Sequence, residues 1–406
     1  MNQSLEDTLD LLHEERLLEL QLRFAETPAP TFDESRRAAV VAEAWRAAGL
    51  EPTIDESGSV VALRPGAEDG PLLVLSAHLD TVFPLDQDVR VRRPGEWCDF
   101  CETPGIVPEG EYHGPGISDC AAGLASVTAV LEALQSSGAQ TPSPVLFVAT
   151  TGEEGLGDLK GARHLFASEW AARIGAFVTV DIGVRGALVF EAPASYRYRF
   201  TFSGPGGHAW DNFGRYNPLH AAGLAVGRIA MYEAARDPRT SYNVGIIAGG
   251  RSINAIPEQA YFELDLRCTS REGLERASSD IITLVEAAQA EYAATVDGES
   301  RMAAELLAHR PGGAMPAGHP FVCAAREALE AEGQVVRSGP GSTDANIPIG
   351  LGIPAVAFPW GGSERNLHSI RESYRPKGRI QDVRALARLA LTYRARGRST
   401  RLRADD

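Results

Sequence analysis

The chain has 406 residues, of which 44% are hydrophobic and 23% are charged, and its formal net charge is −15. This length predicts two or three domains, and the apolar content suffices for a sizeable core. The acidic balance argues against nonspecific nucleic-acid binding, which requires a basic surface, and against attraction to an anionic membrane.

The N-terminal segment, residues 1–24, is acidic and lacks the basic stretch and apolar core of a secretory signal. No apolar run approaches the roughly 18 residues that a membrane span requires. We therefore expect a cytoplasmic protein that binds neither nucleic acid nor a membrane.

Short apolar runs alternate with helical patterns in the first half of the chain and again near its end. The predicted strands are 72–76, 144–150, 176–181 and 354–360, and the predicted helices are 121–134 and 321–333. This alternation is typical of an α/β domain with a mostly parallel sheet. We expect that domain to comprise residues 1–191 and 303–406.

Residues 95–117 are rich in glycine and proline and predict a long loop, which contains the pair Cys98 and Cys101. The chain has five cysteines, and this odd, sparse set argues against a disulfide framework. A zinc clip would normally need a second such pair. We interpret the pair as a loop feature, with a redox or metal site as the alternative.

The pattern changes in the middle of the chain. Tyr196, Tyr198, Phe200 and Phe202 alternate with polar residues, as in a half-buried antiparallel strand. A helix, two strands and a second helix are predicted to follow, at 219–235, 242–249, 260–268 and 271–292. This order indicates a small open-faced α+β domain, inserted at residues 192–302.

Acidic residues and histidines follow the predicted strands of the α/β domain. Ligands of open parallel sheets bind beyond the carboxyl ends of the strands, so these side chains are expected at one crevice. They are His78, Asp80, Glu153, Glu154, Asp181 and His368, with Asp119 just before the helix at 121.

Each of these residues alone has an ordinary explanation, such as a helix N-cap for Asp119 or a solvated turn for Glu153 and Glu154. Together, however, carboxylates crowded at one crevice repel one another and normally need cations. Imidazoles with carboxylates favour zinc, with cobalt or manganese as alternatives. The charges of Asp119, Glu154, Asp181 and one hydroxide balance two divalent ions, which predicts a two-metal hydrolytic centre.

The spacing suggests separate roles within this centre. Asp80 lies two residues after His78 and is expected to accept the second ring N–H of that histidine. Asp119 is the candidate bridging ligand. Neighbouring side chains of an extended turn diverge, so Glu154 can reach a metal while Glu153 faces the bridging hydroxide as the general base.

The motifs HLDTV, GPGISDCAAG, TTGEEG, TVDIG and LHS resemble, in order, the metal-site motifs of the M20 family of di-zinc metallopeptidases. SGPGGHAW and GGRSINAIPEQAYFELDLR resemble its lid motifs, and GSTDANIPIGLGIPAV resembles its C-terminal catalytic segment. The resemblance implies a phosphorylase/hydrolase-like catalytic domain and an inserted ferredoxin-like lid and dimerisation domain, and hence a homodimer.

The resemblance also implies roles for particular residues. His78 and Asp181 would hold one zinc ion, and Glu154 and His368 the other, with Asp119 bridging them. Glu153 would be the base and Asp80 the partner of His78.

Three further residues belong to the implied lid. His208 would stabilise the oxyanion, often across the dimer, although on sequence alone it is an ordinary turn residue. Asn254 and Arg267 would hold polar groups of the substrate, and the alternative for Arg267 is a surface arginine.

The implied reaction is cleavage of an amide bond in a di- or tripeptide of the aminopeptidase type. Asp at position 181 favours this class, because deacylases and carboxypeptidases of the family tend to carry Glu there. An N-acyl-amino-acid deacylase or carboxypeptidase is the alternative, and a non-catalytic binding protein is the third hypothesis. Cys-Ala-Ala after Asp119 and the long loop at 95–112 depart from the family pattern near the expected substrate entrance.

Overall fold

The computed structural model describes residues 2–397 and divides into two compact units. Unit 1 consists of the chain up to Ala192 and from Ala314 onward, and unit 2 is Pro193–Gly313. No helix within residues 2–397 combines the length and the apolar character needed to cross a membrane.

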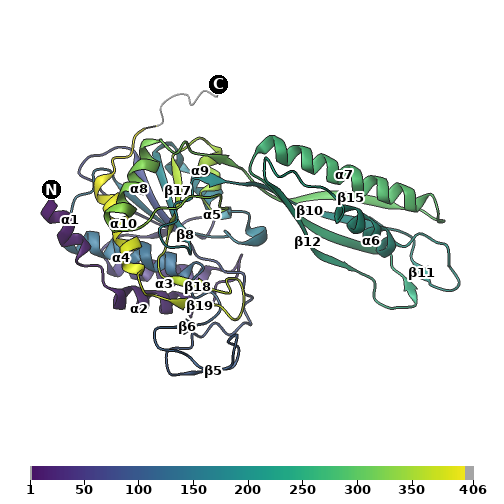
Figure 1. The fold of residues 1–406 in the computed structure, drawn as a ribbon, viewed down its shortest axis with the longest axis horizontal. Coiled ribbons are helices and arrows are strands. Elements are labelled where there is room, and N and C mark those ends of the chain that lie inside the picture. The colour runs from purple at the N-terminus through teal and green to yellow at the C-terminus, as the bar shows by residue number, and fades with distance from the viewer. Residues whose placement is uncertain (1, 398–406) are drawn as a thin grey trace. The chain divides into compact units, whose positions relative to one another are not determined.

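Unit 1 is built on a six-stranded mixed sheet (Figure 1). Its strands, in spatial order, are β1 (Thr53–Ile54), β2 (Val60–Arg64), β7 (Val145–Thr150), β3 (Leu72–His78), β8 (Ile174–Ile182) and β17 (Ala355–Pro359). The last four are mutually parallel, whereas β1 and β2 pair antiparallel at one edge. The prediction of an α/β fold is therefore confirmed, and the two antiparallel edge strands were not predicted.

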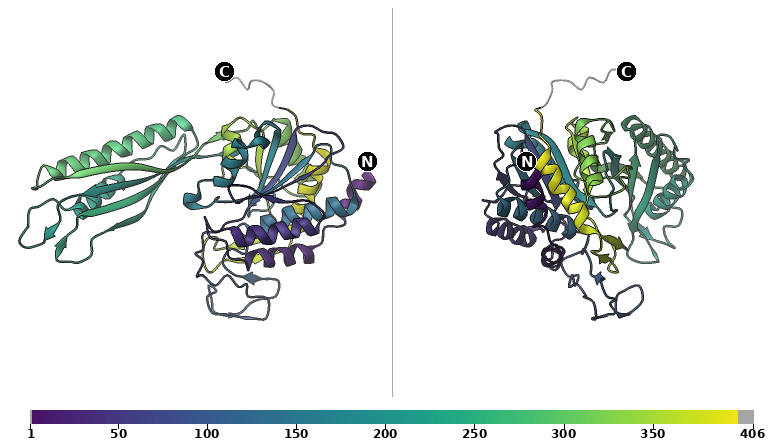
Figure 2. Two further views of the ribbon diagram at one scale, coloured as in Figure 1. Left: turned by 180° about the vertical axis from the view of Figure 1, so that it is seen from behind. Right: turned by 60° about the vertical axis from the view of Figure 1, so that its left-hand side comes forward.

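The parallel strands form because their apolar runs are covered on both faces. Every residue of β3, β7 and β17 is buried, as expected for a sheet between helices. Figure 2 shows helices α2 and α3 beside α4, which itself packs on β3, β7 and β8. The helices of unit 1 are α1 (Asn2–Leu9), α2 (Glu14–Ala25), α3 (Ser35–Ala47), α4 (Ala121–Ser137), α5 (Lys160–Ala167), α8 (Pro320–Ala331), α9 (Asn346–Gly350) and α10 (Arg379–Thr392).

Helix α4 approaches the sheet unusually closely at Gly123. A Cβ atom there would overlap the carbonyl oxygen of Val180 in β8 and lie 3.3 Å from Cβ of Ala77 in β3. Only glycine permits this contact, which brings the start of α4 to the ends of β3 and β8.

Short strands border this end of the sheet. β18 (Ser363–Arg365), β19 (Ser373–Arg375) and β6 (Tyr112–His113) form a three-stranded sheet, and β4 (Trp97–Cys98) pairs with β5 (Gly105–Ile106). The predicted loop at 95–117 thus contains a small hairpin, and a disulfide joins Cys98 to Cys101. The remaining short pairs are β9 (Glu191–Ala192) with β16 (Gly313–Ala314), and β11 (Gly207–His208) with β13 (Ala255–Ile256).

Unit 2 has a four-stranded antiparallel sheet with two helices on one face. In chain order its main elements are β10 (Ala194–Ser203), α6 (Pro218–Ile229), β12 (Thr240–Gly249), β14 (Gln259–Cys268), α7 (Arg271–Ala293) and β15 (Arg301–Arg310). The strand order is β12-β14-β10-β15, and α6 and α7 contact each other as well as the sheet. The core of unit 2 lies between these two layers and includes the stacked rings of Phe200, Phe202 and Phe262.

The sequence analysis ended the central domain at residue 302, but unit 2 continues to Gly313. The difference is strand β15, which pairs with β10 along its whole length. Its sequence, RMAAELLAHR, is rich in helix-forming residues and mostly exposed, so it lacks the alternation that marks a strand.

Candidate metal centre

Five predicted ligands come from separate elements of unit 1 and meet at the carboxyl ends of its parallel strands. His78 is the last residue of β3, and Asp181 is the penultimate residue of β8. Asp119 precedes α4, Glu154 follows β7, and His368 lies between β18 and β19. Asp119, Glu154 and His78 are buried, and His368 is about half exposed.

One half of the cluster is formed by His78, Asp119 and Asp181. Nε2 of His78 lies 2.7 Å from Oδ1 of Asp119 and 3.4 Å from Oδ1 of Asp181. The other half is formed by Asp119, Glu154 and His368. Nε2 of His368 lies 2.9 Å from Oδ2 of Asp119 and 2.9 Å from Oε1 of Glu154.

Asp119 belongs to both halves and offers one carboxylate oxygen to each. Oδ1 faces His78 and Oδ2 faces His368. The ligand atoms of each half lie within 4.8 Å of one another. This arrangement suits a carboxylate that bridges two cations.

The donor set fits divalent cations in this position. Nδ1 of His78 contacts the carbonyl oxygen of Asp80 at 3.1 Å, so a neutral His78 donates its N–H there and turns the Nε2 lone pair toward two carboxylates. Such contacts between lone pairs require either a cation or a proton. Nitrogen and oxygen donors of this kind suit zinc, cobalt or manganese.

Without a cation, the charges in the cluster are balanced by protons. Hydrogen bonds to Asp119 and Glu154 raise the pKa of His368 to about 11, and burial raises the pKa of Asp181 to about 7. Burial opposes ionisation of Asp119, but hydrogen bonds from His368 and His78 hold the pKa of Asp119 below its usual range. Metal binding here must therefore displace protons.

Cys120 lies beside the first half of the cluster, with its sulfur within 4.8 Å of the ligand atoms of His78, Asp119 and Asp181. Its Sγ donates to the carbonyl oxygen of Val180 at 3.2 Å, and burial raises the pKa of the Cys120 thiol to about 12. The thiol is thus engaged by the backbone of β8.

Asp80 lies beside His78, as predicted, and has a further part. Nδ1 of His78 is 3.1 Å from the backbone carbonyl oxygen of Asp80 and 3.4 Å from its carboxylate oxygen Oδ1. The Asp80 carboxylate also accepts the backbone N–H groups of Glu153 and Glu154, each at 2.9 Å. Asp80 is fully buried. Its two hydrogen bonds connect the end of β3 to the turn that carries both glutamates.

Glu153 lies beside the cluster, as the sequence predicted. It is buried, and one of its carboxylate oxygens lies within 4.8 Å of ligand atoms of both His78 and Glu154. A carboxylate in this place can exchange a proton with a water molecule held at the cluster.

Glu372 is a supporting residue that the sequence analysis missed. Its carboxylate accepts the N–H groups of Gly116 and Ser118, at 3.2 and 2.7 Å, and its carbonyl accepts the N–H of Gly114. Glu372 therefore fixes the loop that leads to Asp119. No local pattern could have indicated this, because the contacts cross about 250 residues of sequence.

The other three predicted residues lie in unit 2, apart from this cluster in the chain. His208 ends β11 and is paired in register with Ala255 of β13, next to Asn254. His208 is about half exposed and lies 3.3 Å from Asp211. Arg267 lies near the far end of β14, opposite Ser195, and forms an ion pair with Asp265 at 2.7 Å. His208 and Asn254 thus lie together at the β11–β13 pair, which precedes the start of β14, whereas Arg267 lies at the end of β14.

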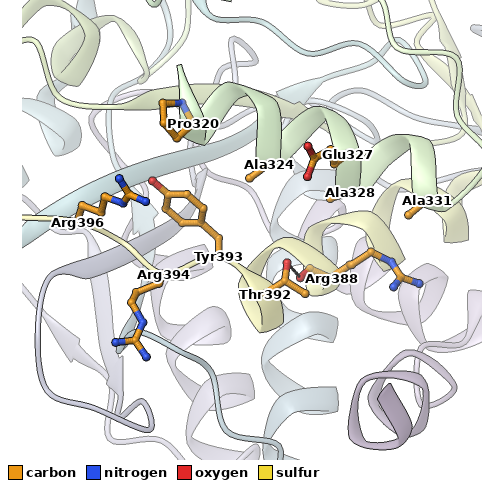
Figure 3. Close-up of a pocket in the computed structure, with 10 residues that line it drawn as sticks. All are labelled: Pro320, Ala324, Glu327, Ala328, Ala331, Arg388, Thr392, Tyr393, Arg394 and Arg396. Carbon is orange, nitrogen blue, oxygen red and sulfur yellow. Dashed lines mark hydrogen bonds between the residues drawn. The ribbon is translucent and has the colours of Figure 1, made fainter. Parts of the chain in front are cut away.

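Unit 1 has one surface hollow lined by residues that neighbour Asp181 in sequence and another lined by residues outside the cluster. One, of about 600 Å³, is lined by residues that follow Asp181 in sequence and by Glu364 of β18. The other, of about 550 Å³, lies between α8 and α10 and is lined by Tyr393, Arg388, Arg394 and Arg396 (Figure 3). None of the described residues lining the second hollow belongs to the cluster.

Comparison with known proteins adds to this geometry. Residues 74–392 match the family model described as peptidase family M20/M25/M40. A succinyl-diaminopimelate desuccinylase from Corynebacterium glutamicum is 24% identical over 403 residues, which cover 97% of this chain and 100% of the relative.

Solved structures share the fold. A tripeptidase from Staphylococcus aureus superposes with a TM-score of 0.74 at 22% identity, covering 94% of this chain and 98% of the other. A dinuclear metal-binding peptidase from Bacillus subtilis gives a TM-score of 0.63 at 18% identity, covering 93% and 97%.

Proposed function

Because the chain belongs to peptidase family M20/M25/M40 and is a metal-dependent hydrolytic enzyme of the peptidase and amidohydrolase type, we propose that it cleaves the amide bond of di- and tripeptides. The observation that carries the proposal is the placement of Asp119. Its two oxygens face two separate imidazoles, each accompanied by a further carboxylate. That arrangement provides for two cations with one shared ligand.

His78, Asp119 and Asp181 would hold one ion, and Asp119, Glu154 and His368 the other. Two divalent ions bound there would supply Lewis acidity and would lower the pKa of a bound water. Zinc is the proposed metal because imidazole and carboxylate ligands suit it best, with cobalt or manganese as alternatives.

Glu153 is the proposed general base. Its buried carboxylate takes a proton from the attacking water and delivers it to the leaving amine. Asp80 acts through position: by accepting the N–H groups of Glu153 and Glu154 it fixes the turn that presents one side chain to the water and the other to a metal.

Unit 2 is proposed to contribute the lid. His208 would stabilise the oxyanion, Asn254 would bind a polar group of the substrate, and Arg267 would bind a carboxylate once released from Asp265. Unit 2 would also form a homodimer. Edge strand β12 exposes Ile246 and Ile247, and other apolar side chains are exposed in α6 and its neighbouring loops. Sedimentation analysis tests this assembly, and a monomer at micromolar concentration would exclude it.

The proposed substrate class rests on the residue at position 181. Asp181 favours the aminopeptidase and dipeptidase branch of the family. The second candidate is removal of an acyl group from an N-acyl amino acid. It is favoured by the desuccinylase relative, which matches this chain over its whole length.

A matched substrate panel separates the two candidates. The zinc-loaded protein is given a tripeptide, a dipeptide, their N-acetylated forms and an N-succinyl amino acid, and kcat/KM is measured for each. The proposal expects the free peptides to be turned over best and N-acetylation to reduce the rate. Preferred turnover of the acylated compounds would replace the peptidase assignment with the deacylase.

A further inference from the structure

A second cluster of metal-binding side chains lies in unit 1, outside the centre described above. Cys98 and Cys101 lie near His113 of β6, and the two sulfur atoms and a ring nitrogen are within 4.8 Å of one another. Nδ1 of His113 is 3.2 Å from Sγ of Cys101. Both cysteines are buried, together with Val107, in a small apolar cluster of their own.

The ring of His113 is held in place from its other side. Nε2 of His113 lies 3.0 Å from Oε2 of Glu111, and the Glu111 carboxylate is itself paired with Arg375 of β19. A histidine whose second ring N–H is given to a carboxylate is the usual arrangement around a metal-bound imidazole.

In this arrangement the contact between His113 and Cys101 lacks a proton or a cation. A carboxylate can only accept a hydrogen bond, so Nε2 of His113 donates its N–H to Glu111, and a neutral imidazole has no other N–H. Nδ1 therefore presents a lone pair to Cys101. The sulfur of a disulfide carries no proton, so the contact in the oxidised pair joins two acceptors. Reduction gives Cys101 a thiol proton that it can donate to Nδ1 of His113. It also allows a cation to replace that proton between the sulfur and Nδ1.

We propose that Cys98, Cys101 and His113 form a second metal site, which binds one zinc-like divalent cation when the disulfide is reduced. A dithiol opens the S–S bond by exchange: it donates two electrons and two protons to the sulfurs and becomes a cyclic disulfide. The cation then displaces both thiol protons and is held by two thiolates and Nδ1 of His113. A water molecule completes the tetrahedral set.

The spacing and the surroundings both suit this cation. Two cysteines separated by two residues can ligate one zinc ion from a single turn, and a histidine is a common further ligand. Thiolates select zinc over magnesium or calcium. The site therefore differs in chemistry from the carboxylate-rich centre, where oxygen ligands predominate.

The second site is attached to elements that carry the hydrolytic centre, which is the cluster of His78, Asp119, Glu154, Asp181 and His368. β6 pairs with β19, with His113 opposite Ser373, and His368 lies on the connection between β18 and β19. Six residues after His113 the chain reaches Asp119. A cation at the cysteines would thus fasten the β4–β5 hairpin to the small sheet that borders the hydrolytic centre.

Metal analysis tests the proposal directly. The protein is reduced with a phosphine, which does not compete for zinc as a dithiol does, loaded with zinc, freed of excess metal and analysed. We expect the wild type to hold one zinc per chain more than the double variant Cys98→Ser, Cys101→Ser. Cys323→Ser, a cysteine of α8 outside both clusters, is the matched control and should retain the full content.

The same comparison is repeated with Asp119→Ala as the parent, so that the result does not depend on the hydrolytic centre. There the cysteine site should retain one zinc, which His113→Ala and the double cysteine variant lose. Cobalt provides an independent readout, because a thiolate-to-cobalt charge-transfer band should appear in the wild type and vanish in the double variant. Equal zinc contents with and without the cysteines, or an unchanged cobalt band, would overturn the proposal.

Discussion

The two proposed metal sites of unit 1 are assembled in different ways. The ligands of the hydrolytic centre come from five elements and extend from His78 to His368, so the whole parallel sheet must fold before they meet. The cysteine site is drawn from one segment, residues 98–113. The first depends on the whole parallel sheet, whereas the second depends on a local turn and on the pairing of β6 with β19, which places His113.

This difference has a chemical counterpart. The distributed centre crowds carboxylates, which repel one another until cations or protons bind. The local site holds its sulfur atoms together with a covalent bond that can be opened. We expect a substitution of one ligand in the hydrolytic centre to weaken metal binding by all the others. We expect a substitution in the cysteine site to affect metal binding at that site alone.

The largest expected effect is that of Asp119→Ala. Because both halves of the hydrolytic centre share this carboxylate, the variant should lose both of its ions and its activity together, while the cysteine site of reduced protein keeps its zinc. Metal analysis and an amidase assay check this outcome. If only one ion were lost and activity persisted, Asp119 would not be the shared ligand.

Glu153→Gln separates chemistry from metal binding. Loss of a general base is expected to lower kcat by on the order of 10²–10⁴, with no change in metal content. Glu169→Gln, at an exposed position of unit 1, is the control and should retain full activity. Equal rates for the two variants would remove Glu153 from the mechanism.

Protons should compete with zinc at the hydrolytic centre. In the metal-free protein the pKa of His368 is about 11, so its imidazole is protonated at neutral pH and must lose that proton on binding. The zinc affinity should therefore rise with pH, and calorimetry in buffers of different ionisation enthalpy should detect proton release. An affinity that is independent of pH between about 6 and 8 would contradict this assignment of charge.

Gly123→Ala tests the close approach of α4 to the sheet. The added methyl group overlaps the carbonyl of Val180, and overpacking of this kind costs about 1–3 kcal/mol in stability. Gly227→Ala in α6, where a Cβ would meet no atom within 4 Å, should be neutral or stabilise by up to about 1 kcal/mol. Denaturant unfolding compares them, and an equal effect at both positions would refute the packing argument.

The effect expected at Glu111 is confined to the cysteine site. Glu111→Gln should weaken zinc binding at the cysteine site by about 10–100-fold, as for other carboxylates that orient a metal-bound histidine, while kcat at the hydrolytic centre stays the same. Chelator competition on reduced protein measures the affinity. Unaltered binding would mean that the carboxylate does not position His113.

The sequence predicted that His78, Asp119, Glu154, Asp181 and His368 lie together, because most of them follow strands that are recognisable as buried apolar runs. It could not predict Glu372, whose hydrogen bonds to Gly116 and Ser118 exist only after the chain has folded. Nor could it identify His113 as a partner of Cys98 and Cys101, since the pairing of β6 with β19 places that ring.

Strand β15 was missed for a different reason. It is an edge strand that is mostly exposed and rich in helix-forming residues, so its sequence carries little period-two signal. In the same way, the sequence identified Asp80 as a residue of the site but not its hydrogen bonds to the backbone of Glu153 and Glu154. Side-chain types reveal chemistry, whereas contacts with distant backbone groups depend on the tertiary fold.

Anomalous diffraction from crystals of the zinc-loaded protein tests the central claim most directly. At the carboxyl ends of the parallel strands we expect two peaks roughly 3.5–4 Å apart, the usual separation in two-metal hydrolytic sites, with one carboxylate oxygen of Asp119 directed to each. His78 and Asp181 should contact one ion, and Glu154 and His368 the other. A single ion, or two ions that do not share Asp119, would contradict the account.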